Sequence, residues 1–216
     1  MAHGANYRVP KRRRREGKTD YYKRYIMVKN RQFRVVIRKT NRYISVQFVY
    51  PTPIGDYTIV SAHSRELVKL FNWMGGSKNT PAAYLTGLLA GIRAKKLGIV
   101  NAVPDIGLHR PVKGSKIFAA IKGVIDAGIN IPCSDDVIPS EDRIKGAVIA
   151  EYAKNLSEKN PELFTRQFSE LLRKGFDPRN IVEHFEQLRN LIIKTYENIP
   201  ESSYSAEIIS LLTQGR

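Results

Sequence analysis

The densest group of potentially functional side chains is the run Lys11-Arg12-Arg13-Arg14-Arg15, which Tyr21 and Tyr22 follow closely. Guanidinium groups form paired hydrogen bonds with phosphate oxygens, and tyrosine rings offer faces on which unpaired bases stack. This combination favours a nucleic-acid partner. A basic run alone also occurs in solvated tails and nuclear-targeting signals, so the interpretation needs support from the rest of the chain.

Support comes from the segment after the run, where apolar and polar residues alternate. Arg34, Arg38 and Gln47 fall on one face of predicted strands, on the surface, where they could extend the phosphate contacts. Further groups that could hydrogen-bond to sugars or base edges are Asn41, Asn79 and Thr80.

DNA is the alternative polyanion. The sequence has no zinc finger, zipper or recognition-helix module, and the basic run has few apolar side chains that could wedge into a minor groove. A flexible basic segment beside a compact body suits irregular folded RNA, on which it becomes ordered. We therefore expect RNA, with DNA as the second hypothesis.

Groups for catalysis are scattered along the chain. The four histidines form no pair with metal-ligand spacing, and they are His3, His63, His109 and His184. Gly114-Ser115-Lys116 lacks the upstream glycine of a phosphate-binding loop and is expected to be a loop-to-helix cap.

Four aspartates could in principle hold two magnesium ions for a nuclease reaction, namely Asp105, Asp126, Asp135 and Asp136. Each lies beside a predicted strand end, a helix end or a proline-flanked loop, which are ordinary sites for turn chemistry. We expect a protein without catalytic or metal-binding residues and without a cofactor of its own. Structural Mg²⁺ could accompany it only through a bound RNA.

The charge of the chain is concentrated near its N-terminus. The 216 residues include 36 Lys and Arg against 20 Asp and Glu, which gives a net charge of +16 and a pI near 10.0. Residues 1 to 42 hold 15 cations and 2 acids (+13), residues 43 to 150 hold 12 and 8 (+4), and residues 151 to 216 hold 9 and 10 (−1). A basic arm beside a nearly neutral body is typical of a protein with a phosphate-rich partner.

The apolar residues exclude other classes of protein. They make up 42% of the chain, enough for a folded core. No stretch reaches the roughly 18 apolar residues of a membrane span, and no apolar segment follows the N-terminal charges, so we expect neither a membrane protein nor a secreted one. The one cysteine, Cys133, is expected to be a small buried side chain in a reducing, cytoplasmic compartment.

The arm is expected to have little structure of its own. Gly4, Pro10, Gly17 and mutually repelling charges predict an extended first part. A short helix could begin after Thr19 or Asp20 as the N-cap.

Alternation with a period of two predicts three strands, at residues 33 to 38, 44 to 49 and 57 to 62. Thr40-Asn41-Arg42 supplies a hairpin turn between the first two, and residues 51 to 56 a turn to the third.

Helices and one further strand follow. Ser64 should cap a helix that ends at Phe71, and Asn79 should precede a longer helix that Gly98 ends. A strand at residues 99 to 103 and a helix at residues 115 to 127 complete this part. The expected fold is α/β, a mixed β-sheet with packed helices.

The last third of the sequence predicts three helices, at residues 140 to 156, 161 to 173 and 178 to 198. Because this part is nearly neutral, we expect it to pack around the core or contact a neighbour. For residues 200 to 216 the sequence predicts no definite element. The expected organisation is a basic N-terminal RNA-binding arm at 1 to 30, a mixed α/β core at 31 to 133 and a mainly helical C-terminal extension at 134 to 216.

Four blocks of sequence resemble one known family. They are Arg14-Arg15-Glu16-Gly17-Lys18-Thr19-Asp20-Tyr21-Tyr22-Lys23-Arg24, Ala83-Tyr84-Leu85-Thr86-Gly87, Asp105-Ile106-Gly107-Leu108 and Gly114-Ser115-Lys116-Ile117-Phe118-Ala119-Ala120-Ile121-Lys122-Gly123. The chain is similar over residues 5 to 195 to the archaeal and eukaryotic large-subunit ribosomal proteins that bind 5S rRNA, the eighteenth in the universal large-subunit series. The short C-terminal extension resembles the archaeal form more than the eukaryotic counterpart, the 5S rRNA-binding fifth protein.

The resemblance implies a non-catalytic constituent of the cytoplasmic ribosome. Its fold would be of the translational-machinery type, and its place the central protuberance of the large subunit. The implied partners are 5S rRNA, 23S-type large-subunit rRNA and neighbouring ribosomal proteins. Together with the analysis of the residues, it gives these RNA-binding candidates: Arg8, Lys11, Arg12, Arg13, Arg14, Arg15, Lys18, Thr19, Tyr21, Tyr22, Lys23, Arg24, Arg34, Arg38, Asn41, Arg42, Gln47, Asn79 and Thr80.

Overall fold

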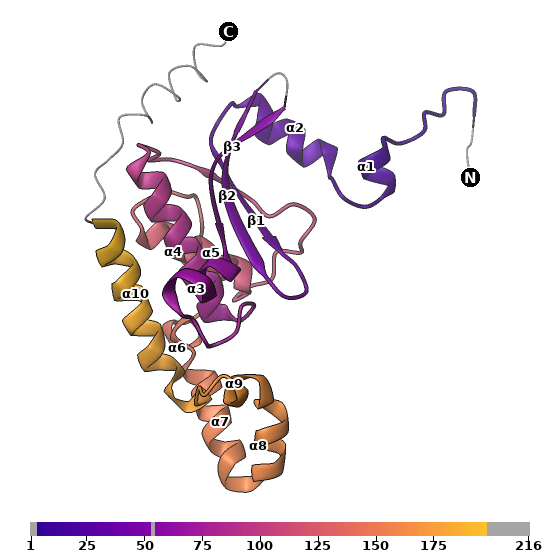
Figure 1. The fold of residues 1–216 in the computed structure, drawn as a ribbon. Helices are drawn as coiled ribbons and strands as arrows, with labels where there is room; N and C mark the ends of the chain where they lie inside the picture. Colours follow the sequence, from indigo (N-terminus) through magenta and orange to yellow (C-terminus); the bar gives the residue numbers. More distant parts are fainter. Residues whose placement is uncertain (1–3, 53–54, 198–216) are drawn as a thin grey trace.

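The alternating segments form a four-stranded mixed sheet in the computed structural model, which describes residues 4 to 52 and 55 to 197 (Figure 1). Strands β1 (Arg34–Lys39), β2 (Ile44–Pro51) and β3 (Asp56–His63) form an antiparallel meander. Strand β4 (Val103–Asp105) pairs parallel to β1, so the order across the sheet is β3-β2-β1-β4. The predicted α/β class with a mixed sheet is confirmed.

The core lies between one face of this sheet and two long helices, α4 (Thr80–Lys96) and α5 (Lys116–Asp126). Val35 and Ile37 of β1, with Val46 and Phe48 of β2, are fully buried on that face. Helix α4 is buried on nearly all sides because the sheet, α5 and α10 (Ile181–Glu197) surround it. Its buried residues therefore lie on more than one side of the helix.

Two glycines allow α4 and α5 to approach each other closely. A Cβ on Gly87 would overlap the carbonyl oxygen of Ala120, and a Cβ on Gly123 would overlap that of Tyr84. The helices thus meet through their backbones at this crossing, and this contact fixes α5 against the sheet.

The expected elements between β3 and α5 are present, with two corrections. Helix α3 (Ser64–Phe71) is capped by His63 and not by Ser64, because Glu66 closes a capping box with the backbone of His63. The Ser64 hydroxyl instead accepts a hydrogen bond from the backbone N–H of Ile44 at 3.1 Å. Strand β4 begins at residue 103, so the predicted strand at 99 to 103 is displaced, because the N–H of Ile99 still bonds Ala94 at the end of α4.

The C-terminal part divides more finely than the three predicted helices. The described elements after α5 are η1 (Asp135–Val137), α6 (Glu141–Lys145), α7 (Ala147–Lys159), α8 (Pro161–Gln167), α9 (Ser169–Arg173), η2 (Pro178–Asn180) and α10. Gly146, at φ 88°, breaks the first predicted helix. Helices α7, α8 and α9 extend away from the sheet (Figure 1), and the unassigned residues 200 to 216 lie outside the described ones.

The three predicted parts of the chain, with boundaries at residues 30 and 133, stay a prediction. No helix among the described residues is both long enough and apolar enough to cross a bilayer.

The close contact between α4 and α5 predicts how small substitutions at this crossing change the stability of the protein. Gly87→Ala and Gly123→Ala should each lower the free energy of unfolding by about 1 to 3 kcal/mol, because a methyl group must push the two helices apart. Urea denaturation followed by circular dichroism measures the loss. Gly55→Ala is the matched control, since its Cβ would meet open space, and a loss as large in the control would contradict the packing argument.

Candidate nucleic-acid interface

The basic arm contains two short helices, α1 (Arg12–Arg15) and α2 (Tyr21–Lys29), and α1 projects beyond the sheet (Figure 1). The expectation that the basic run is extended is therefore wrong in this structure. One helical turn forms because Glu16 lies between two cations, 2.7 Å from Arg12 and 2.8 Å from Lys18. Hydrogen bonds from Lys18 and Arg12 hold the pKa of Glu16 below its ordinary value.

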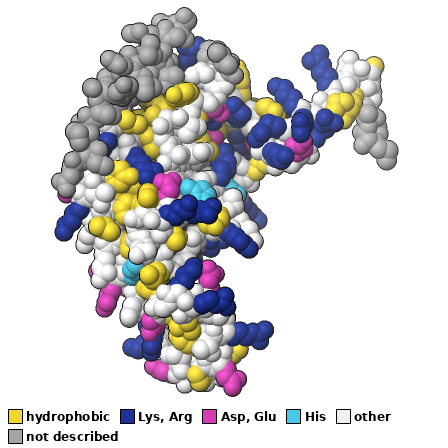
Figure 2. All heavy atoms as spheres, viewed as in Figure 1, with side chains coloured by type: hydrophobic (Ala, Val, Ile, Leu, Met, Phe, Trp, Pro, Cys, Tyr) yellow, Lys and Arg dark blue, Asp and Glu magenta, His cyan; other side chains and the backbone are white. Residues whose placement is uncertain are grey.

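The outer arm keeps most of its cations available. Arg8, Arg14 and Arg15 are exposed, and none of them pairs with a carboxylate in the described part of the chain. Figure 2 shows dark-blue Lys and Arg side chains gathered along the arm, with little acidic surface beside them. A surface of this kind attracts a polyanion.

The tyrosines of the arm differ in their surroundings. Asp20 caps α2, as one of the two predicted N-caps, by accepting from the N–H groups of Tyr22 and Lys23. The Tyr22 side chain is 76% exposed, so its ring faces are available for stacking. Tyr21 is half-buried, and the Lys11 ammonium lies 4.8 Å from the centre of its ring.

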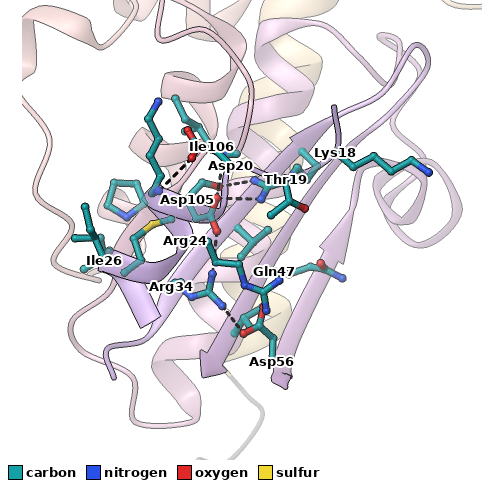
Figure 3. A pocket seen from close by; sticks show the side chains of 18 of the residues that line it. Lys18, Thr19, Asp20, Arg24, Ile26, Arg34, Gln47, Asp56, Asp105 and Ile106 are labelled. Atoms are coloured by element: carbon teal, nitrogen blue, oxygen red, sulfur yellow. Dashed lines mark hydrogen bonds and ion pairs between the residues drawn. The ribbon is translucent and has the colours of Figure 1, made fainter. Parts of the chain in front are cut away.

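A cleft of about 540 Å³ lies between the arm and the face of the sheet opposite the core (Figure 3). Its volume is within the range of ligand sites, about 300 to 1,000 Å³. Six cations and three carboxylates line it: Arg13, Lys18, Lys23, Arg24, Arg34 and Arg38, with Asp20, Asp56 and Asp105. Thr19 and Gln47 are among its other polar groups, and Ile26 and Met27 of α2 give it an apolar side.

The floor of the cleft is a buried arginine. Arg34 of β1 is 2% exposed, and its Nη1 donates to Asp105 Oδ2 at 3.0 Å. Its Nη2 lies 2.7 Å from Asp56 Oδ1, a close ion pair without hydrogen-bond geometry, and its Nε is buried without a partner among the described residues. The prediction that Arg34 lies on the surface is therefore wrong.

The same two carboxylates hold neighbouring cations. Arg24 of α2 donates to Asp56 Oδ2 at 2.8 Å, which ties the arm to the start of β3. Arg38 donates to Asp105 Oδ1 at 2.9 Å and remains 39% exposed. Figure 3 shows Arg24 and Arg34 turned toward Asp56, whereas Lys18 extends away from them.

The remaining candidates lie outside the cleft. Asn41 and Arg42 are exposed at the β1–β2 turn, where the N–H of Thr40 bonds the carbonyl of Tyr43 as expected of a hairpin. Asn79 caps α4 by accepting from Ala82 N–H, so its amide is already used.

Thr80 is less accessible than its predicted contact with RNA requires. It is the first residue of α4 and only 9% exposed, because the packing of that helix covers it.

Of the predicted RNA-binding residues, the cleft therefore brings together Arg13, Lys18, Thr19, Lys23, Arg24, Arg34, Arg38 and Gln47. The others remain on the outer arm, on the exposed side of α2, at the hairpin or at the start of α4.

Asp56 was not predicted as part of this site, because the sequence places it in the turn at residues 51 to 56. The available signal was Arg34, a cation in a strand of otherwise buried residues, which requires a counter-ion nearby.

The carboxylates weighed for nuclease chemistry do not converge. Asp105 is enclosed by arginines, while Asp126 accepts from Tyr84 Oη at 2.8 Å and pairs with Lys122. Within the described residues no three His, Cys, Asp or Glu side chains gather as metal ligands.

The described histidines act as hydrogen-bond acceptors for backbone N–H groups. His63 accepts from Arg65, His109 from Lys39 and His184 from Met74. His3 lies outside the described residues.

Comparison with known proteins supports one family. The family model described as ribosomal large subunit proteins 60S L5 and 50S L18 matches residues 5–101 and 93–134. A large ribosomal subunit protein uL18 of Staphylothermus marinus is 55% identical over 199 residues, 92% of this chain and 98% of that protein. The uL18 proteins of Sulfurisphaera tokodaii and Ignicoccus hospitalis are 58% and 51% identical, over 89% and 91% of this chain and 97% and 96% of their own lengths.

The buried ion pairs predict a large effect on stability. Asp105→Asn should lower the free energy of unfolding by about 3 to 5 kcal/mol, because it leaves the buried Arg34 charge with weakened compensation. Asp126→Asn is the control, since its pair with Lys122 is partly exposed and should contribute about 1 kcal/mol or less. Chemical denaturation of both variants measures the difference, and equal small losses would mean that Asp105 does not compensate Arg34.

Proposed function

This chain belongs to the family of large-subunit ribosomal proteins described as L5 and L18, and on that premise we propose that its basic arm binds 5S rRNA. As a member of that family it is a structural constituent of the large ribosomal subunit in the cytoplasm and not an enzyme. Its partners are accordingly rRNA and ribosomal proteins. The expectation of a non-catalytic RNA-binding protein agrees with this family.

The observation that carries the proposal is the charge of the arm. Residues 1 to 42 carry +13 of the net +16, and Arg8, Arg14 and Arg15 have no acidic partner in the described structure. Such a concentration of cations is repulsive in the free protein. Phosphate groups remove that repulsion, and counter-ions released from the RNA add a favourable entropy.

The geometry divides the contacts into two kinds. The outer arm offers guanidinium groups for phosphates and the exposed ring of Tyr22 for an unpaired base. The cleft adds Lys23 of α2 and Arg38 of β1, together with Lys18, which precedes α2 and pairs with Glu16. The arm would thus contribute the affinity and the cleft the orientation.

The proposal extends to the position of the protein in the subunit. A protein that holds 5S rRNA with a basic arm and presents a nearly neutral helical extension can contact large-subunit rRNA and neighbouring proteins on its other sides. We propose that it helps attach 5S rRNA to the large-subunit rRNA in the central protuberance. The chain would need no cofactor of its own, and Mg²⁺ would enter with the RNA.

The salt dependence of binding tests the phosphate contacts. In the triple variant Arg8→Gln, Arg14→Gln and Arg15→Gln, the affinity for 5S rRNA should fall roughly a hundredfold, and the slope of log affinity against log salt should become shallower by about 2 to 3. Filter binding at several salt concentrations gives both numbers. A transfer RNA of similar length serves as the competitor that shows whether 5S rRNA is preferred.

The matched control removes three arginines elsewhere, through Arg65→Gln, Arg166→Gln and Arg173→Gln on α3, α8 and α9. This control lowers the net charge as much as the arm variant does, and its affinity for 5S rRNA should stay within about twofold of that of the unmodified protein. Equal losses in the two triple variants would mean that only total charge matters and would remove the arm from the mechanism.

Stacking on the arm is tested separately. Tyr22→Ala should weaken binding to 5S rRNA by about 1 to 3 kcal/mol without changing the salt slope, because stacking involves no ion release. The control is Tyr152→Ala, an exposed tyrosine of α7 that is far from the arm in sequence. Unchanged affinity in Tyr22→Ala would show that its ring stacks on no base.

A further inference from the structure

A second group of cations lies at the hairpin end of β1, and we call it the lysine cluster. It consists of Lys39 at the end of β1, Lys78 before α4 and Lys116 at the first turn of α5. Burial lowers the pKa of Lys116, and the positive charges of Lys78 and Lys39 lower it further, so both of these lysines lie near Lys116.

The backbone around the cluster is held firmly. The N–H of Lys39 donates to His109 Nε2 at 3.3 Å, which joins the hairpin to the loop before α5. Lys78 Nζ donates to Asn41 Oδ1 at 3.4 Å, which joins the loop before α4 to the hairpin. These two contacts place Lys39 and Lys78 at the same hairpin, although they lie on elements that are distant in sequence.

No carboxylate compensates these charges within the described residues. The ion pairs of that part of the chain involve none of Lys39, Lys78 and Lys116. A further cation borders the group, since Arg143 Nη1 is 3.3 Å from where a Cβ on Gly114 would lie. Neighbouring cations that lack an acidic partner favour the binding of an anion from outside.

The start of α5 supplies neutral donors at the same place. Ser115 is its N-cap residue, yet its side chain caps no backbone N–H, and its hydroxyl oxygen is buried without a hydrogen-bond partner among the residues that the structure describes. Uncapped N–H groups at the start of a helix favour an anion, and more so beside cations. Gly114-Ser115-Lys116, which is no phosphate-binding loop by its sequence, thus combines an uncapped helix start with nearby cations.

We propose that the lysine cluster and the start of α5 bind phosphate groups of an rRNA segment other than the one held by the arm. The inference rests on the proposed function, since it takes rRNA as the polyanion of the assembled particle. Phosphodiester oxygens fit the donors present, which are ammonium groups, a hydroxyl and helix N–H groups.

The lysine cluster and the anchor of the arm lie at opposite ends of β1. Arg24 and Asp56 anchor the arm at the Arg34 end of β1, whereas the cluster surrounds Lys39 at the other end. Five residues of extended strand separate these ends, roughly 16 Å at about 3.3 Å per residue. The protein would therefore bridge two RNA segments across the length of one strand.

Lysine reactivity in the assembled particle tests the site directly. Native large subunits and the free chain are treated with an acetylating reagent, and the modified lysines are identified by mass spectrometry. Lys39, Lys78 and Lys116 should react at least fivefold more slowly in the subunit than in the free chain. Their reactivity should return after ribonuclease digestion of the subunit.

Persistent protection after digestion would assign the cluster to a protein partner, and absence of protection would mean that nothing covers it. Either result would overturn the proposal. Crosslinking by ultraviolet light before digestion should attach nucleotides to peptides that contain these lysines, and those nucleotides should differ from the ones crosslinked to residues 8 to 24.

Binding by full-length variants distinguishes this inference from the proposed function. Lys39→Gln, Lys78→Gln and Lys116→Gln together should leave the affinity for 5S rRNA within about twofold if the arm holds that RNA. Against deproteinised large-subunit rRNA, the triple variant should bind at least tenfold more weakly, with a shallower salt slope.

The control for these variants is Lys154→Gln, Lys159→Gln and Lys194→Gln, which removes three exposed lysines from α7 and α10. A loss of 5S rRNA binding as large as that of the arm variant would show a single RNA surface and overturn the inference while sparing the proposed function. The inference would also be overturned if affinity for large-subunit rRNA fell only in the control variant or in neither variant. Unchanged 5S rRNA affinity in the arm variant would instead contradict the proposed function.

Discussion

The ion pairs of Arg34 are the interaction on which the arrangement of this protein depends. A buried guanidinium is tolerated only with carboxylates beside it, and Asp105 and Asp56 come from two different strands. The ion pair between Asp105 and Arg34 holds β4 against β1. The chain reaches β4 from β3 through helices α3 and α4. Asp56 also binds Arg24, so the same compensation that stabilises the sheet determines where the arm leaves it.

This dependence divides the arm into two functional parts. Helix α2 is anchored over the sheet and forms one wall of the cleft, so its cations occupy fixed positions before any RNA arrives. The outer part, around α1, carries the exposed Arg8, Arg14 and Arg15, which have no acidic partner in the described chain. An arm folded wholly onto its own protein would have contradicted phosphate binding. Only the segment next to the sheet is folded in this way, and the basic run remains exposed.

The features predicted correctly from the sequence are those that the local spacing of residues determines. Alternation located three strands, Asn79 and Gly98 bounded the long helix, and Asp20 was one of two expected caps for α2. It also placed Arg34, Arg38 and Gln47 on one face of the sheet, as the cleft confirms.

The predictions that were wrong concern residues whose contacts come from distant parts of the chain or from a neighbouring element. The period of two cannot tell an exposed face from one that an arm covers, so Arg34 was expected on the surface. The cap of α3 depended on Glu66 closing onto His63, and β4 was displaced because Ile99 still completes the turn of α4. Neither the close backbone contact at Gly87 nor the convergence of Lys39, Lys78 and Lys116 is visible in the sequence, because each requires the tertiary fold.

Strand β1 connects these features physically. Its residues alternate between the core, where Val35 and Ile37 pack, and the cleft, where Arg34 and Arg38 lie, and it ends at Lys39 in the lysine cluster. Because the inward residues are fully buried, a shift of one residue in register would place arginines in the core. The packing that fixes the register therefore also fixes the distance between the two basic surfaces. A rigid spacing of this kind is what a protein needs in order to hold two RNA segments in a constant relation, and it follows from the hydrophobic core without any contact between the surfaces themselves.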